Sequence, residues 1–252
     1  MLTSYHNHTP LCNHATGTPR EFVLRAIEAG YTHFGFSDHA PHCFRDENAH
    51  SRMLPDELPL YVSEISGLRE EFKDAIDLKI GLELEYFPLT HKTDMESYRR
   101  AGIEYFILGQ HLTKSGTHED HVNSFARTSE GEKYTHYVDR CIEALETGDF
   151  CYFAHPDVFH YRGDADFYAS ESERLIRAAI RRSVPLEVNM YGLSDGRHYP
   201  YEPFWRIAAR LGATAVLGRD AHSTERVFSK EENLLAQRFA DKIGLELKSV
   251  IL

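Results

Sequence analysis

The segment LTSYHNH (residues 2–8) is rich in β-forming residues and includes His6 and His8, whose imidazole side chains are of the type that often binds metal ions. Side chains two positions apart on a strand point to the same side, so these two imidazoles form a pair aimed in one direction. The first residues of a chain usually fray, unless something holds them in place. The segment therefore predicts a first strand whose carboxyl end carries metal ligands.

The same pattern recurs along the chain. Six further β-rich runs occupy residues 32–39, 78–87, 104–111, 150–156, 184–190 and 213–222. All but one of them end in ligand-type side chains, namely His39, Glu83 and Glu85, His111, His155, and Asp220 with His222. The exception is 184–190, where we expect Glu187 and Asn189 at the rim of a site. Repetition at strand ends is much stronger evidence for a metal site than any single histidine.

Helical patterns separate these runs. Residues 18–30 begin with a capping box, Thr18 to Glu21, and end at Gly30. Apolar residues recur at helical spacing in 58–72 and 134–145, a second capping box opens 170–182, and 204–212 and 232–244 both end at glycine. Strands that alternate with helices form parallel units, and seven such units suit a barrel with its site at the carboxyl ends of the strands. An open doubly wound sheet is the alternative, although the chain has no glycine-rich phosphate-binding motif.

Composition limits the function further. The chain has 252 residues and a net charge of −11, which argues against nucleic-acid or anionic-membrane partners. We find no internal boundary and expect a single domain over residues 1–252, of undetermined oligomeric state. Four cysteines without a CxxC pair, and no signal or membrane-spanning segment, predict a cytoplasmic protein. Mixed imidazole and carboxylate ligands favour Zn, Mn or Fe.

The ordered set of motifs resembles the PHP (polymerase and histidinol phosphatase) family. The motifs are HNH (6–8), His14, SDH (37–39), GLE (81–83), GQH (109–111), AHP (154–156) and GRDAH (218–222). The resemblance implies a distorted (β/α)7 barrel of the α/β class with three divalent metal ions, and hydrolysis of a phosphoester. Histidinol phosphate, an intermediate of histidine biosynthesis, is the favoured substrate. Two departures stand out: Arg219 replaces a small residue, and Met190 and Tyr191 follow the asparagine of the sixth run.

Carried over by position, the resemblance implies nine metal ligands. The first ion would be held by His6, His8, Glu83 and Asp220, the second by Glu83, His111 and His155, and the third by His14, His39 and His222. We predict that a hydroxide bridging two ions attacks phosphorus in line, with Glu83 as the bridging carboxylate. Asp220, His222 or a bound water would give a proton to the leaving alkoxide.

Phosphate binding requires positive charge in the loops that follow the strands. Arg162, Arg197, Arg45 and His42 are the candidate substrate-binding residues, because an arginine grips phosphate with two parallel hydrogen bonds. Cys12 and Cys43 flank predicted ligands and are expected to be bystanders. Three alternatives stay open: a phosphatase for phosphotyrosine or a nucleotide, a metal-dependent amidohydrolase, and a polymerase-associated PHP domain.

Overall fold

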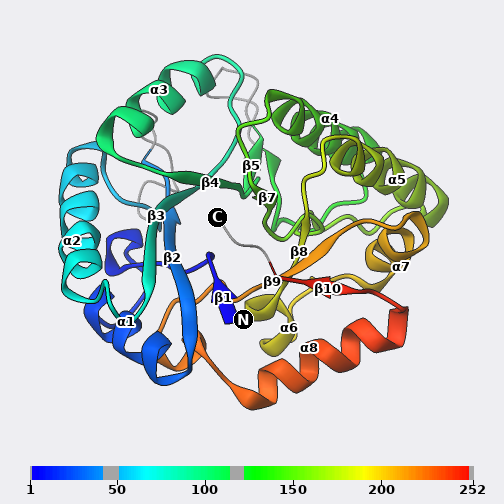
Figure 1. The fold of residues 1–252 in the computed structure, drawn as a ribbon. Helices are drawn as coiled ribbons and strands as arrows, with labels where there is room; N and C mark the ends of the chain where they lie inside the picture. The colour runs from blue at the N-terminus through cyan, green and yellow to red at the C-terminus, as the bar shows by residue number, and fades with distance from the viewer. Residues whose placement is uncertain (1, 42–50, 114–121, 250–252) are drawn as a thin grey trace.

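The computed structural model describes residues 2–41, 51–113 and 122–249, and its main feature is one curled parallel sheet surrounded by helices (Figure 1). Eight strands pair in the order β1-β2-β3-β4-β7-β8-β9-β10, and every pairing is parallel. The strands are β1 (Leu2–Ser4), β2 (Tyr31–His39), β3 (Asp77–Leu84), β4 (Tyr105–Leu108), β7 (Tyr152–Phe153), β8 (Leu186–Asn189), β9 (Ala215–Gly218) and β10 (Leu247–Lys248). The predicted α/β fold with a distorted barrel is confirmed.

The sheet closes at one point, next to the carboxyl ends of its strands. Asn7, beyond β1, forms a parallel bridge with Ala221, beyond β9. The His8 amide donates to the Ala221 carbonyl at 2.9 Å, and the Ala221 amide donates to the His6 carbonyl at 3.3 Å. At its start, β9 pairs instead with β10. The barrel is therefore closed where the predicted ligands lie, and β1 and β9 are not paired at the opposite end.

Aromatic side chains fill the barrel interior. Tyr5, Tyr105, Ile107 and Tyr152 form a small buried cluster, separate from the larger core between the sheet and the helices. The Tyr105 hydroxyl donates to the carbonyl of Tyr5 at 2.8 Å. Its ring lies so close to Gly81 that a Cβ there would come within 2.3 Å of it. The interior is a packed floor beneath the strand ends, as in other α/β barrels.

Helices cover the outside of the sheet (Figure 1). They are α1 (Pro19–Glu28), α2 (Leu58–Glu71), α3 (His91–Ala101), α4 (Gly131–Thr147), α5 (Ala165–Arg181), α6 (Met190–Ser194), α7 (Glu202–Leu211) and α8 (Lys230–Ile243). Short 3₁₀ turns, η1 (Pro10–Cys12), η3 (Pro55–Glu57) and η4 (Thr224–Val227), and a hairpin of β5 (Leu112–Thr113) and β6 (Val122–Asn123) complete the described elements. The capping box of Thr18 and Glu21 is present as predicted. Among the described residues, no helix is long and apolar enough to cross a membrane.

One helix boundary was predicted wrongly. The sequence suggested that Ser170 caps a helix, but α5 begins a turn and a half earlier, and Asp164 caps it by accepting the Phe167 amide at 2.8 Å. Ser170 and Glu173 both lie inside the helix, where Glu173 pairs with Arg177 and Arg210. A serine and a glutamate three residues apart on a helix surface imitate a capping box when a better cap stands upstream.

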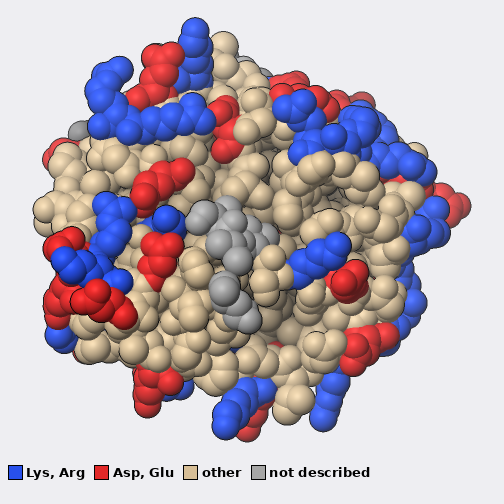
Figure 2. All heavy atoms as spheres, viewed as in Figure 1, with Lys and Arg blue, Asp and Glu red and all other residues tan. Residues whose placement is uncertain are grey.

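The charged surface carries both signs. On the face shown in Figure 2, lysine and arginine side chains alternate with aspartate and glutamate around the periphery, and uncharged residues occupy much of the middle. Basic side chains do not gather into a continuous stripe on this face. That distribution agrees with the acidic net charge of −11.

Candidate metal centre

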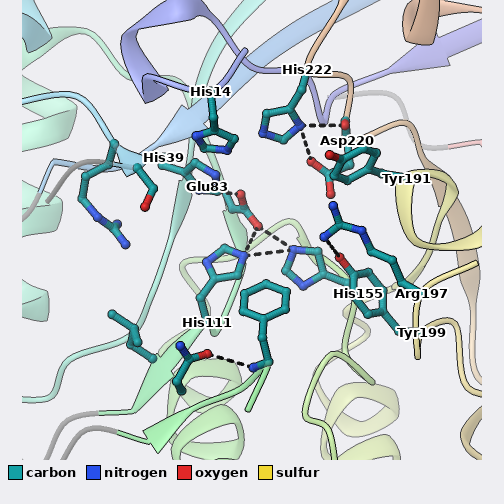
Figure 3. A pocket seen from close by; sticks show the side chains of 15 residues that line it. His14, His39, Glu83, His111, His155, Tyr191, Arg197, Tyr199, Asp220 and His222 are labelled. Carbon is teal, nitrogen blue, oxygen red and sulfur yellow. Dashed lines mark hydrogen bonds and ion pairs between the residues drawn. The ribbon is translucent and has the colours of Figure 1, made fainter. Parts of the chain in front are cut away.

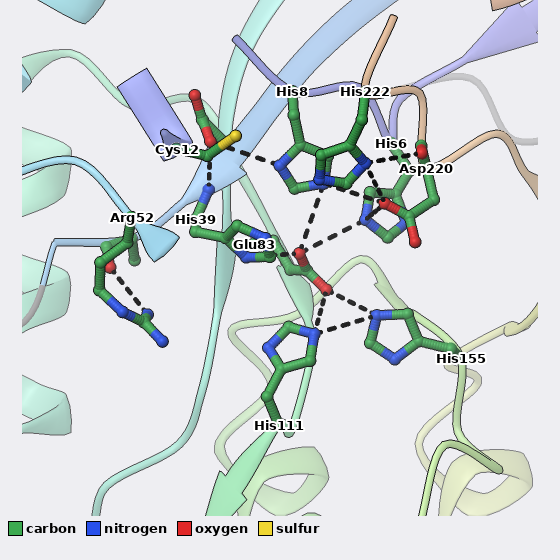
Figure 4. Close-up of polar contacts among 12 residues, drawn as sticks. His6, His8, Cys12, His39, Arg52, Glu83, His111, His155, Asp220 and His222 are labelled. Carbon is green, nitrogen blue, oxygen red and sulfur yellow. Dashed lines mark hydrogen bonds and ion pairs between the residues drawn. The ribbon is translucent and has the colours of Figure 1, made fainter. Parts of the chain in front are cut away.

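Glu83, near the end of β3, stands at the centre of the predicted site and is almost completely buried (Figure 4). Its two carboxylate oxygens face different groups of imidazoles. Oε2 lies 3.4 Å from His6 Nε2 and 2.9 Å from His39 Nδ1. Oε1 lies 2.8 Å from His155 Nε2 and 3.3 Å from His111 Nε2. One carboxylate can thus serve two neighbouring cations.

The first group of ligand atoms has the dimensions of a tetrahedral metal site. Nε2 of His6 and Nε2 of His8 lie between 3.2 and 3.6 Å from Glu83 Oε2 and from Asp220 Oδ1. Metal–ligand bonds of about 2.1 Å in a tetrahedron place neighbouring ligand atoms about 3.4 Å apart. Both Nε2 atoms and Glu83 Oε2 are buried without a hydrogen-bond partner. Buried unpaired polar atoms are costly, and a shared cation would satisfy all of them at once.

The second group shares Glu83 and adds two imidazoles. His111 Nε2 and His155 Nε2 are 3.3 Å apart, and both point at Glu83 Oε1. The third group, His14, His39 and His222, brings candidate ligand atoms within 4.8 Å of one another. In this group, the Nε2 atom of His222 is buried and has no hydrogen-bond partner. The structure therefore gathers all nine predicted ligands at one end of the barrel.

Three of the imidazoles are backed by the carboxylates of Glu187, Asp38 and Glu85, a role that was not predicted for them from the sequence. Nδ1 of His6 donates to Glu187 at 2.8 Å, and Nδ1 of His8 donates to Asp38 at 3.3 Å. His111 Nδ1 makes the same kind of bond to Glu85. Such bonds fix the ring tautomer, so that Nε2 keeps its lone pair for a metal. Asp38 lies within the SDH motif, and Glu85 lies two residues after the GLE motif. Their closeness in sequence to predicted ligands is the feature from which this supporting role could have been predicted.

Glu187 and Asn189 lie deeper than expected. The prediction placed them at the rim, but both are fully buried on β8. Asn189 Nδ2 donates to Glu187 at 2.8 Å and to Asp220 Oδ2 at 3.1 Å, and its Oδ1 accepts the Gly192 amide. The strand without an obvious ligand therefore supports the ligands of its neighbours.

The charges of the site compensate one another. Burial opposes ionisation of Glu83, but His111 and His6 hold its pKa well below the usual range. Burial also opposes protonation of His111, yet Glu83 and Glu85 raise its pKa to about 10. Burial opposes protonation of His8 as well, yet the nearby carboxylates of Asp220 and Asp38 raise its pKa to about 9. In the metal-free protein, protonated imidazoles thus supply the positive charge that metal ions would otherwise bring to the carboxylates.

A cavity of about 180 Å³ opens over the ligands (Figure 3). Arg197, Tyr191, Tyr199 and Phe125 form part of its wall. The Arg197 guanidinium lies 4.1 Å from the centre of the Tyr191 ring and 3.4 Å from the Tyr199 hydroxyl. The guanidinium of Arg226 also lies over the Tyr191 ring, 4.5 Å from its centre. Arg197 is therefore held over the mouth of the site, as its place in the sequence suggested, and its contact with the substrate stays a prediction.

Of the other predicted substrate-binding residues, only Arg162 falls within the described part of the chain. Arg162 is exposed, with its guanidinium 4.5 Å from the Tyr201 ring, and is not among the residues that line the cavity. His42 and Arg45 fall outside the described residues, as does Cys43. Burial raises the pKa of the Cys12 thiol to about 12, so Cys12 is a neutral thiol beside the ligands.

The backbone is unusual at two ligands. His155 has φ of +30° and Asp220 has φ of +50°, values that residues other than glycine seldom adopt. Such conformations concentrate at functional sites. Arg219, next to Asp220, points away from the cavity and donates to the Tyr31 hydroxyl at 3.1 Å. Strand alternation predicted this direction for Arg219.

A parallel barrel that gathers imidazoles and carboxylates at the carboxyl ends of its strands defines a class, the metal-dependent hydrolases. Comparison with known proteins specifies the family. The model of the PHP domain matches residues 4–190, and the chain belongs to the PHP domain family. A relative from Deinococcus radiodurans, named a probable histidinol-phosphatase, is 30% identical over 96% of this chain and 91% of its own length.

Other relatives agree with this result. A histidinol-phosphatase from Lactococcus lactis is 25% identical over 88% of this chain and 84% of its own length. The crystal structure of histidinol phosphate phosphatase from the same organism, complexed with zinc, L-histidinol and phosphate, superposes with a TM-score of 0.73. It is 22% identical and covers 97% of this chain and 94% of that one. The superposition shows that the two proteins share the fold.

Proposed function

We propose that this protein is a metal-dependent phosphatase that hydrolyses histidinol phosphate to histidinol. The observation that carries the proposal is the sharing of Glu83 between two groups of ligand atoms, beneath a cavity lined by Arg197. Such a centre suits a phosphomonoester, whose negative charge needs more than one positive partner. The names of the relatives from Deinococcus radiodurans and Lactococcus lactis support histidinol phosphate as the substrate.

The centre would hold three divalent ions of the Zn, Mn or Fe type. The ligands proposed for them are His6, His8, Glu83 and Asp220, then Glu83, His111 and His155, and then His14, His39 and His222. Divalent ions bound here would neutralise the phosphate and lower the pKa of a bound water to about 7. The unpaired buried atoms of the site fit such ions.

The chain's own residues bind and orient the substrate. Arg197 would grip the phosphate oxygens, held in place by Tyr191. Asp220 is kept ionised by nearby imidazoles, His6 foremost, which hold its pKa well below the usual range. Of the predicted proton donors, His222 and a bound water are our candidates for protonating the leaving oxygen, because an ionised Asp220 has no proton to give and would serve as a metal ligand. Phe125 stacks on His111 with ring centres 5.7 Å apart and lines that side of the cavity.

The same proposal includes further substrate-binding candidates, a single-domain organisation and a cellular location. Arg162, Arg45 and His42 are further candidates for contact with the substrate, although Arg162 does not line the cavity and Arg45 and His42 lie outside the described residues. Residues 1–252 would form one phosphoesterase domain, because the ligands come from strands along most of the chain. A cytoplasmic location is supported by the free thiols of Cys12 and Cys141.

Phosphate release after metal removal and restoration tests the proposal. Protein treated with a chelator and resupplied with Mn or Zn should hydrolyse histidinol phosphate faster than phosphotyrosine or a nucleoside monophosphate. No release from any phosphoester would reject the proposal, and hydrolysis of a dihydropyrimidine amide alone would favour an amidohydrolase. Faster phosphate release from another phosphoester would show that this compound, and not histidinol phosphate, is the preferred substrate.

A single substitution tests the second group of ligands. His111→Ala should abolish phosphatase activity while the fold persists, because His111 faces Glu83 Oε1 directly. His136→Ala, on the partly exposed side of α4, is the control and should retain full activity. An active His111→Ala variant would contradict the assignment of this residue.

A further inference from the structure

Arg52 is a buried arginine that joins three segments carrying proposed ligands. Its Nη1 donates to the carbonyl of Ala40, which directly follows β2, at 3.2 Å. Nη1 and Nη2 donate to the two oxygens of Glu85, each at 3.0 Å. The Arg52 carbonyl accepts a bond from Asn13 Nδ2 at 3.1 Å, one residue before His14. The Arg52 side chain therefore ties the end of β2 to the end of β3, and its backbone carbonyl links both to the loop after β1.

Glu85 passes this contact on to a metal ligand. Its Oε1, which accepts from Arg52, also accepts from His111 Nδ1 at 3.1 Å. A proton on Nδ1 leaves the Nε2 lone pair free, and Nε2 faces Glu83 Oε1 at 3.3 Å. The orientation of His111 in the second group thus depends on where the Glu85 carboxylate is held.

Burial makes the pair of charges interdependent. Arg52 is 6% exposed and Glu85 is 2% exposed. A carboxylate so deeply buried is costly without a partner, and a guanidinium that bonds both oxygens supplies the charge and the orientation together. Lysine could supply the charge but not the paired geometry.

Arg52 also lines the cavity, so direct substrate binding is the competing role. Its two terminal nitrogens are, however, directed to Glu85 and to a backbone carbonyl. Arg197, in contrast, is stacked on an aromatic ring at the cavity wall. The contacts of Arg52 are those of a residue that acts through another residue.

We propose that Arg52 is a positioning residue which, through Glu85, holds His111 in the tautomer and orientation that a metal requires. The proposal rests on the proposed function for the nature of the centre. Its main readout, retention of zinc, does not require the phosphatase activity.

Zinc retention in single and double variants tests the proposal. Arg52→Met and Glu85→Gln should each weaken binding of one zinc equivalent about 10- to 100-fold, measured as metal content after graded chelator challenge. The double variant should bind zinc no worse than Glu85→Gln alone, because the effect of Arg52 on His111 runs through the Glu85 carboxylate. Arg52→Lys should recover only part of the loss.

The double variant removes both buried charges, so it remains informative if Arg52→Met does not fold. The control is Arg69→Met, which breaks an exposed pair with Glu104 at 3.0 Å and should leave zinc retention unchanged. Equal losses from Arg52→Met in the wild-type and Glu85→Gln backgrounds would overturn the proposal. So would an increase in KM for histidinol phosphate with zinc retention intact, since that would make Arg52 a substrate-binding residue. Zinc retention that follows these expectations in an enzyme without phosphatase activity would reject the proposed function alone.

Discussion

Gly109, which follows β4, lies directly against the central carboxylate of the site. A Cβ at this position would come within 2.1 Å of Glu83 Oε1 and 2.5 Å of Glu83 Cγ. Ordinary contact begins at 3.4 Å, so the side chain in Gly109→Ala falls about 1.3 Å short of the space it needs. Glu83 is surrounded by imidazoles and cannot move without disturbing both ligand groups.

The expected loss follows from this distance. Metal sites tolerate ligand displacements of about 0.2 Å, and a misplacement of about 1 Å at a reacting centre costs about 100-fold in rate. Gly109→Ala should therefore lower kcat/KM by about 100-fold or more, equivalent to about 2.7 kcal/mol of transition-state stabilisation. Overpacking should also cost about 1–3 kcal/mol in the free energy of unfolding.

Steady-state phosphate release from histidinol phosphate, zinc content and urea unfolding measure these effects. Gly67→Ala is the matched control. Gly67 lies on α2, and apart from the neighbouring helix backbone no heavy atom lies within 4 Å of a Cβ added there. That variant should keep full activity and gain up to about 1 kcal/mol in stability. If Gly109→Ala kept its zinc and stayed within threefold of wild-type activity, Glu83 would not be confined as described.

Three further predictions concern the surroundings of the ligands. Glu187→Gln should weaken zinc retention about tenfold or more, because the imidazole that donates to it loses a charged acceptor; equilibrium dialysis measures the change, and unaltered affinity would contradict it. Tyr191→Leu should raise KM more than it lowers kcat, because Arg197 loses the ring at 4.1 Å; steady-state kinetics would disprove this if KM stayed constant. Zinc binding should release protons and weaken as pH falls from 9 to 6, because His8, with a metal-free pKa of about 9, must lose its proton; calorimetry in two buffers should detect this release.

The strands were predictable because each combines a β-rich run with a ligand at its end. Each of the seven predicted runs overlaps a strand of the sheet. The additional strand β10 has only two residues, Leu247–Lys248, and is held by backbone pairing to β9. The hairpin of β5 and β6 is equally short. Two residues are too few to show an alternating pattern, and these strands, unlike the equally short β7 with His155 after it, are not followed by a predicted ligand of their own.

The site was predictable where neighbouring residues share a strand, and less so where distant strands meet. The pair of His6 and His8 follows from two-residue spacing alone. The bond from His6 to Glu187 joins residues 181 positions apart and depends on how the barrel closes. The arginines show the same limit, since Arg162 and Arg197 both follow strand ends and only Arg197 lines the cavity.

The single bridge between Asn7 and Ala221 has a mechanical consequence. An ion held by His6, His8 and Asp220 would span the same seam, so it would act as a cross-link between the two ends of the barrel. Closing so long a loop removes conformational freedom from the unfolded chain, as a disulfide does. Unlike a disulfide, this cross-link would be lost whenever the free metal concentration fell. The stability of the junction between β1 and β9 would therefore depend on the metal supply.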